Sequence, residues 1–142
     1  MIGYGLADTS VESIDRRSDD VLVFGVKTTE NDLVGNLGTP SEAGSVMTYD
    51  PASDTYLWYK VVEPVDFSYR FMVFFSPDGN RVLLHYQDGS ATDVNPALLF
   101  LNAADGAQLG TQGMRKVYGS GQVYARDSLT MNNDGSKVYW LH

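Results

Sequence analysis

The chain has no cysteine among its 142 residues, which excludes disulfides, thiolate metal ligands and cysteine nucleophiles. It also has no apolar run approaching the ~20 residues that a membrane-spanning helix needs. The N-terminal segment MIGYGLADTSVES lacks both the basic start and the apolar stretch of a signal peptide. We therefore expect a soluble protein that is either not exported or a processed piece of a longer chain, for which an extracellular location stays open.

Basic residues are scarce: 10 Lys and Arg stand against 18 Asp and Glu, which gives a net charge of −8. Phosphate groups are bound by clustered Lys and Arg, so nucleic acid and anionic membrane surfaces are disfavoured as partners. The hydrophobic fraction of 43% is that of an ordinary globular protein. We expect one folded segment that extends over residues 1–142.

Helical periodicity is also missing, and β-hairpin patterns take its place. The clearest is FMVFFSPDGNRVLLHY at 71–86, in which two apolar strands flank a reversal built from Ser-Pro-Asp-Gly. Long loops are expected at 28–44 and 87–96, which are rich in Gly, Pro, Asn and Asp. The pattern predicts an all-β fold with hairpins near 11–27, 45–62, 71–86, 97–112 and 123–141.

Two kinds of hairpin alternate along the chain. The first, third and fifth superpose without gaps at offsets of 61 and 56 residues, and the second and fourth at an offset of 52. Such alternation is what a four-stranded antiparallel repeat looks like in sequence. The first kind yields three columns of equivalent residues: Ile14, Phe75 and Met131; Val21, Val82 and Val138; Leu22, Leu83 and Tyr139.

The turns carry a family resemblance. SPDGNRVLL and NNDGSKVYW resemble the turn between the first two strands of a blade in TolB-like and YVTN-type β-propellers. DPASDTYLW and NAADGAQLG resemble the turn between the last two strands in quinoprotein and YVTN-type blades, although Asp54 stands where those blades usually have Gly. The Gly-His and Trp-Asp dipeptides of WD40-like repeats are absent, and the period exceeds the ~40–45 residues expected of them.

This resemblance implies four-stranded blades of a β-propeller, of which the chain supplies about two and a half. Propellers close with about four to eight blades, so we expect the ring to be incomplete in this chain. Self-association, a partner protein or further chain would complete the stack. We assign structural roles to the turn residues, because Asp and Gly stabilise tight reversals: Ser76, Pro77, Asp78, Gly79, Asp134, Gly135, Asp50, Asp105 and Gly106.

Residues that carry chemistry are sparse. His85 and His142 end two strands without neighbouring ligands, and metal sites need clustered ones. Asp88 and Asp93 in DGSATD are weak metal candidates that lack the acidic spacing of an EF-hand loop. No Gly-x-Ser-x-Gly elbow is present. We predict no catalytic residue, no metal and no cofactor.

Aromatic residues make up 12% of the chain. Five are candidates for partner contact, because interfaces favour Tyr and Trp, although packing between sheets is the favoured interpretation. They are Tyr56, Trp58, Tyr59, Phe67 and Tyr69. The leading hypothesis is a non-catalytic interaction or structural module that binds a protein or saccharide. The alternative is a fragment of a propeller enzyme, quinoprotein dehydrogenase-like or lactonase-like, whose catalytic residues lie elsewhere.

Overall fold

A computed structural model describes residues 9–28, 43–62, 72–90, 93–113 and 129–140. These residues form ten β-strands and no helix, so the all-β expectation is confirmed for the described part of the chain. No helix long and apolar enough to cross a membrane occurs among them. The expected loop at 28–44 lies largely outside these ranges, and so do residues 123–128 and 141 of the expected fifth hairpin.

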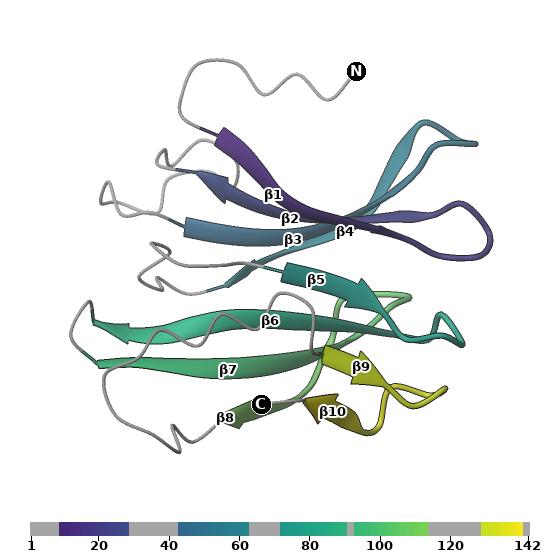
Figure 1. Cartoon of the computed structure of the whole chain (residues 1–142). Coiled ribbons are helices and arrows are strands. Elements are labelled where there is room, and N and C mark those ends of the chain that lie inside the picture. Colours follow the sequence, from purple (N-terminus) through teal and green to yellow (C-terminus); the bar gives the residue numbers. More distant parts are fainter. Residues whose placement is uncertain (1–8, 29–42, 63–71, 91–92, 114–128, 141–142) are drawn as a thin grey trace.

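The strands form two four-stranded antiparallel sheets and one separate hairpin (Figure 1). Within each sheet, strands that follow one another in sequence are neighbours in space. Sheet A contains β1 (Thr9–Arg16), β2 (Leu22–Thr28), β3 (Ala43–Asp50) and β4 (Thr55–Val62). Sheet B contains β5 (Met72–Phe75), β6 (Arg81–Ser90), β7 (Asp93–Asn102) and β8 (Gln108–Gly113), and the hairpin pairs β9 (Leu129–Met131) with β10 (Val138–Trp140).

The expected loop at 87–96 is wrong. β6 and β7 continue through it and stay paired from Gln87 with Pro96 to Ser90 with Asp93. Pro96 pairs with Gln87, and β8 pairs with β7 only from Ala97 on, so no second strand in the described part of the chain needs the missing N–H of the proline. Gly89 and Asp88 belong to β6, and Asp93 belongs to β7.

The main core lies between the two sheets, which Figure 1 shows one above the other. Side chains of a strand point alternately to its two faces, and one face of each sheet supplies this core. Sheet A contributes Val23, Val46, Trp58 and Val62, and Val21 just before β2 adds to them. Sheet B contributes Val73, Phe75, Val82, Leu84, Leu99 and Leu101.

Side chains of β1 in sheet A form hydrogen bonds to the free edge of β5 in sheet B. The Ser13 hydroxyl accepts a hydrogen bond from the Val73 N–H at 3.1 Å. The Asp15 carboxylate accepts one from the Phe75 N–H at 2.8 Å. Two backbone donors on the outer edge of β5 are therefore satisfied by side chains, because no strand pairs with this edge in the described part of the chain.

Three repeated units begin with the hairpins β1–β2, β5–β6 and β9–β10, and the reversals inside these hairpins differ in length. Each is closed by a backbone hydrogen bond, and the first one is a residue shorter than the other two. The positive-φ residue is Asp20 in the first, and Gly79 and Gly135 in the others. The closing bonds join Arg17 N–H to Val21 C=O at 2.8 Å, Ser76 N–H to Arg81 C=O at 2.9 Å, and Asn132 N–H to Lys137 C=O at 3.1 Å.

The gapless superposition is therefore wrong for the first unit. Counted from the closing bonds, Leu22 rather than Val21 is equivalent to Val82. On the preceding strand, Arg16 rather than Ile14 is equivalent to Phe75. The 56-residue offset between the second and third units holds, because the residue pairs before their reversals match, Phe75 with Val82 and Met131 with Val138.

Candidate functional site

The carboxylates of the Asp-Gly reversals are engaged in their own turns. Asp78 accepts hydrogen bonds from the Ser76 hydroxyl at 2.6 Å and from the Asn80 N–H at 3.0 Å. Asp134 accepts hydrogen bonds from both the hydroxyl and the N–H of Ser136, at 2.7 and 3.0 Å. These bonds, the Ser hydroxyl first, hold the pKa of both carboxyl groups below the ordinary value. The oxygens stabilise the turns.

The second kind of turn uses its polar residues in the same way. Asp50 accepts hydrogen bonds from the Ser53 hydroxyl at 2.7 Å and the Ala52 N–H at 2.9 Å, which lower its pKa. Asp105 accepts one from the Ala107 N–H at 2.9 Å. Asp54 has a φ of 53°, close to the 70° of Gly106, which lies 52 residues later. Asp54 thus takes the left-handed conformation that Gly usually provides.

Trp58 lies between the sheets, 8% exposed. Its indole N–H donates a buried hydrogen bond of 2.8 Å to the Ala103 carbonyl, in the turn between β7 and β8 of sheet B. The ring lies so close to Gly106 that a Cβ there would be 2.6 Å from Trp58 Cε3. Trp58 therefore packs between the sheets, which is the interpretation that the sequence favours for these aromatic residues, and it is not available to a partner.

Tyr56 and Tyr59 are exposed on β4, the edge strand of sheet A, at 42% and 61%. Leu57 is the extra residue of a β-bulge in β4. Thr48 of β3 pairs with Trp58 and Tyr49 of β3 pairs with Tyr56, so no residue of β3 pairs with Leu57. The bulge leaves both tyrosines on the face opposite Trp58. The other two aromatic candidates, Phe67 and Tyr69, lie outside the described residues.

These tyrosines border a second apolar cluster on the face of sheet A that points away from sheet B. The centre of this face, Phe24, Val26 and Met47, is buried, with Leu22 and Tyr49 packed against it. The Tyr49 and Tyr56 rings contact each other, with centroids 5.3 Å apart. We call this the outer face of sheet A and include its exposed margins: Val11 and Ile14 on β1, and Tyr56 and Tyr59 on β4.

The outer face of sheet A is equivalent to the face of sheet B that packs on sheet A. Leu22, Phe24 and Met47 of the outer face correspond to Val82, Leu84 and Leu99 of the core. Sequence reasoning missed Val11 and Ile14, although VESI alternates apolar and polar residues as a one-sided strand does.

The candidate metal ligands are not part of any metal-binding cluster among the described residues. Asp88 pairs with Asn95 and Asp93 with Ser90, so both lie on the hairpin of β6 and β7. His85 is buried on β6, whereas His142 lies outside the described residues. No group of three or more His, Cys, Asp or Glu side chains that could hold a metal occurs among the residues that the structure describes.

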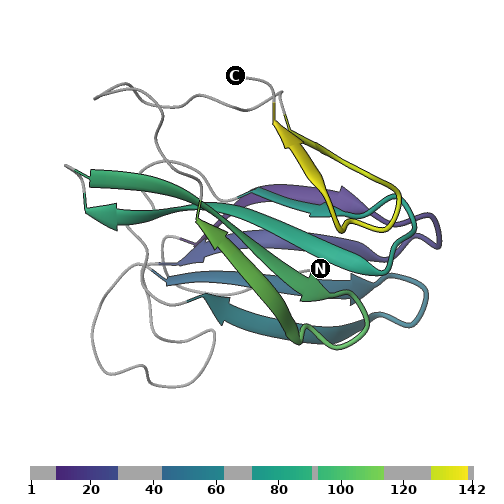
Figure 2. The same cartoon turned by 90° about the horizontal axis from the view of Figure 1, so that it is seen from below.

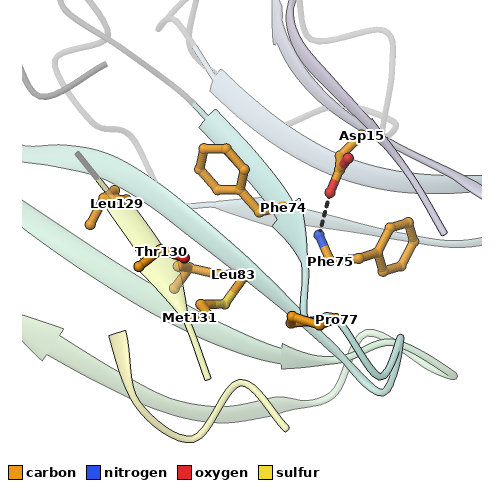
Figure 3. Close-up of a pocket in the computed structure, with 8 residues that line it drawn as sticks. All are labelled: Asp15, Phe74, Phe75, Pro77, Leu83, Leu129, Thr130 and Met131. Carbon is orange, nitrogen blue, oxygen red and sulfur yellow. Dashed lines mark hydrogen bonds between the residues drawn. The ribbon is translucent and has the colours of Figure 1, made fainter. Parts of the chain in front are cut away.

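A small apolar cleft of about 190 Å³ lies between sheet B and the β9–β10 hairpin (Figure 3). Phe74 points toward β9, whereas the Phe75 ring lies on the other side of β5. The Asp15 carboxylate is the single charged group of the lining, and it is bonded to the Phe75 N–H. The lining consists of Asp15, Phe74, Phe75, Pro77, Leu83, Leu129, Thr130 and Met131.

Comparisons of the chain with models of protein families, with curated proteins and with solved structures found no match.

Proposed function

We propose that the protein is a non-catalytic, propeller-type interaction module whose stack of sheets is continued by a protein partner at the outer face of sheet A. One observation carries this proposal. The outer face repeats, position by position, the face by which sheet B packs on sheet A. This is the pattern of a sheet face that packs on another β-sheet, because sheets pack through apolar inner faces. Phe24, Val26 and Met47 at its centre are already buried in the single chain, so the partner contacts the exposed margins.

The margins of the outer face supply the accessible contact area. Ile14 is 57% exposed and Tyr59 61% exposed, at opposite edges of the sheet. Exposed tyrosines favour protein contact, since each combines a large apolar ring with a polar end. The partner to which we commit is a sheet of the same kind in a second copy of the chain, because sheet A already packs against its own repeat, sheet B.

Sedimentation equilibrium over a wide range of protein concentration tests this function. We expect the native chain to self-associate, and Tyr59→Asp to shift the equilibrium toward the monomer, because burial of a carboxylate in an apolar contact is unfavourable. Leu109→Asp is the matched control: Leu109 is 51% exposed in the equivalent bulge of β8 but lies off the outer face. A native chain that stays monomeric, or equal effects of the two substitutions, would overturn the proposal.

The saccharide partner and the propeller-enzyme alternative remain predictions, because no specific observation on the described residues favours either.

A further inference from the structure

The β9–β10 hairpin docks on sheet B through its turn (Figure 2). The Asp78 N–H of one reversal donates to the Asn133 carbonyl of the next at 2.9 Å. Gly135 lies so close to Ser76 that a Cβ at Gly135 would be 2.8 Å from the Ser76 Cβ. This contact fixes β9 beside the cleft of Figure 3, along the edge where β5 lies.

The direction of the β9 amides follows from the pairing. The bond from Asn132 N–H to the Lys137 carbonyl makes these two residues a hydrogen-bonded pair. Hydrogen-bonded and non-hydrogen-bonded pairs alternate along an antiparallel ladder. The next pair, Met131 with Val138, is therefore non-hydrogen-bonded. The N–H and C=O groups of Met131 point away from β10, and those of Leu129, two residues earlier, do the same.

At the first junction, between sheet A and sheet B, the equivalent outward N–H groups have hydrogen-bond acceptors. Val73 and Phe75 correspond to Leu129 and Met131, and their amides donate to Ser13 and Asp15 of the preceding unit, as described above. A carboxylate and a hydroxyl thus provide the acceptors that a neighbouring strand would otherwise provide.

At the second junction, between sheet B and the β9–β10 hairpin, the described residues provide no such acceptors. In the corrected register, Met72 and Phe74 occupy the positions of Ser13 and Asp15. Neither side chain offers a strong acceptor, and no other described residue is seen to accept from the Leu129 or Met131 amide. The apolar cleft occupies this junction, with Phe74 and Leu83 in its wall.

We propose that this cleft binds an extended peptide segment of a partner protein. Carbonyl oxygens of the segment accept hydrogen bonds from the outward N–H groups of β9, and its N–H groups donate to the outward C=O groups. Outward groups on alternate residues, Leu129 and Met131, form the pattern that an added β-strand matches. The cleft of about 190 Å³ is smaller than the ~300–1,000 Å³ of ordinary small-molecule pockets, and suits one apolar side chain of the segment.

Charge defines the segment further. The chain has a net charge of −8, and Asp15 lies in the lining of the cleft. A neutral or basic segment is therefore favoured over an acidic one, because the protein repels negative charge. The cleft lies between sheet B and the β9–β10 hairpin, whereas the outer face of sheet A points away from sheet B, so either proposal can fail without the other.

Amide hydrogen exchange measured by NMR on the free protein is the first test. We expect the Leu129 and Met131 amides to exchange much faster than that of Thr130 between them, which belongs to a hydrogen-bonded pair with Tyr139. Fraying of the hairpin would speed all three alike. Equal protection at the three positions would show that the outward donors are already occupied, and would overturn the proposal.

Peptide binding is the second test, with the blocked pentapeptide Ac-KTLTK-NH2 as the probe and Ac-ETLTE-NH2 as its acidic counterpart. We expect the basic peptide to shift the Leu129 and Met131 amide resonances saturably, and the acidic peptide to bind more weakly. The decisive variant is Phe74→Asn, which places a neutral acceptor at the position equivalent to Asp15 and adds no charge that would itself attract the basic peptide. It should slow exchange of the Met131 amide and weaken binding about tenfold, since it supplies the acceptor internally.

Phe74→Leu is the matched control, because it shortens the side chain without adding an acceptor, and it should keep the fast Met131 exchange and the binding. Dispersed NMR spectra of both variants establish that they are folded. Absence of amide shifts at β9 with the basic peptide, or equal loss of binding in the two variants, would contradict the assignment.

Discussion

Replacement of Gly106 by alanine is expected to destabilise the protein clearly more than the same replacement at Gly79. Both glycines have positive φ, 70° and 74°, which costs an alanine roughly 1–2 kcal/mol. Alanine also lowers the conformational entropy of the unfolded chain, which stabilises the folded state by about 0.4–1 kcal/mol. The backbone contribution is therefore similar at the two positions, and the neighbouring side chains decide the difference.

The neighbours differ in how far they can move. At Gly106 a Cβ would lie 2.6 Å from Cε3 and 2.9 Å from Cδ2 of the buried Trp58 ring, which a hydrogen bond to Ala103 holds in place. At Gly79 it would lie 2.7 Å from Cδ of Arg17, a flexible side chain that can move at the cost of its ion pair with the exposed Asp19, and exposed ion pairs generally contribute about 1 kcal/mol or less. Overpacking against a fixed group costs about 1–3 kcal/mol, so we expect Gly106→Ala to lose that much more stability than Gly79→Ala.

Equilibrium unfolding in urea measures the difference, provided that the denaturant slopes of the variants agree. A double-mutant cycle with Trp58→Leu isolates the contact, because removal of the ring should bring the cost of Gly106→Ala close to that of Gly79→Ala. Equal losses for the two alanine variants in the native background, or a gap that survives Trp58→Leu, would refute the argument that Trp58 packs on Gly106.

Three further predictions concern the reversals. Gly79→Val should destabilise the protein by about 1 kcal/mol or more, since a β-branched residue disfavours positive φ, and an unchanged melting temperature would contradict this. Asp20→Gly should raise the free energy of unfolding by up to about 1 kcal/mol, because relief of a φ of 69° outweighs both the greater freedom of glycine in the unfolded chain and the loss of an exposed ion pair with Arg16; a lower melting temperature would count against it. The lowered pKa values of Asp78 and Asp134 stabilise the fold above the ordinary carboxyl pKa of about 3.9, and this contribution should disappear as the pH falls through the lowered values. Thermal melts across the acid range should therefore show a weaker acid dependence in the double variant Asp78→Asn and Asp134→Asn than in the native chain.

Local turn chemistry made part of this fold predictable from sequence. The reversal at Ser76 to Gly79 is specified by residues next to each other, so the hairpin of β5 and β6 could be recognised without any partner. The first reversal could not be aligned correctly, because it is one residue shorter and Asp20 takes the conformation that Gly79 takes in the second. A turn that is one residue shorter and has no glycine leaves no signal in the pattern of apolar residues.

The candidate partner surface was predictable only in part, and the bulge at Leu57 explains why. In a regular strand Tyr56 and Trp58 would share a face and Tyr59 would lie on the other. The extra residue in β4 reverses this relation: it turns Trp58 into the core and leaves the two tyrosines on the outer face. Three aromatic residues in four positions therefore could not be assigned to faces from their spacing, because a β-bulge depends on pairing with β3.

The two junctions between units differ most at the positions that face the next unit. The first is closed by Ser13, Asp15 and Trp58, which bond to backbone groups of sheet B. At the second, the equivalent residues are Met72, Phe74 and Gly110, and a Cβ at Gly110 would meet no atom within 4 Å. A repeat needed only for packing could use the same closing residues at both junctions. Their replacement by apolar residues and glycine at the second junction leaves an apolar cleft beside outward backbone groups, and this difference between the repeats is the strongest reason to look for a binding partner there.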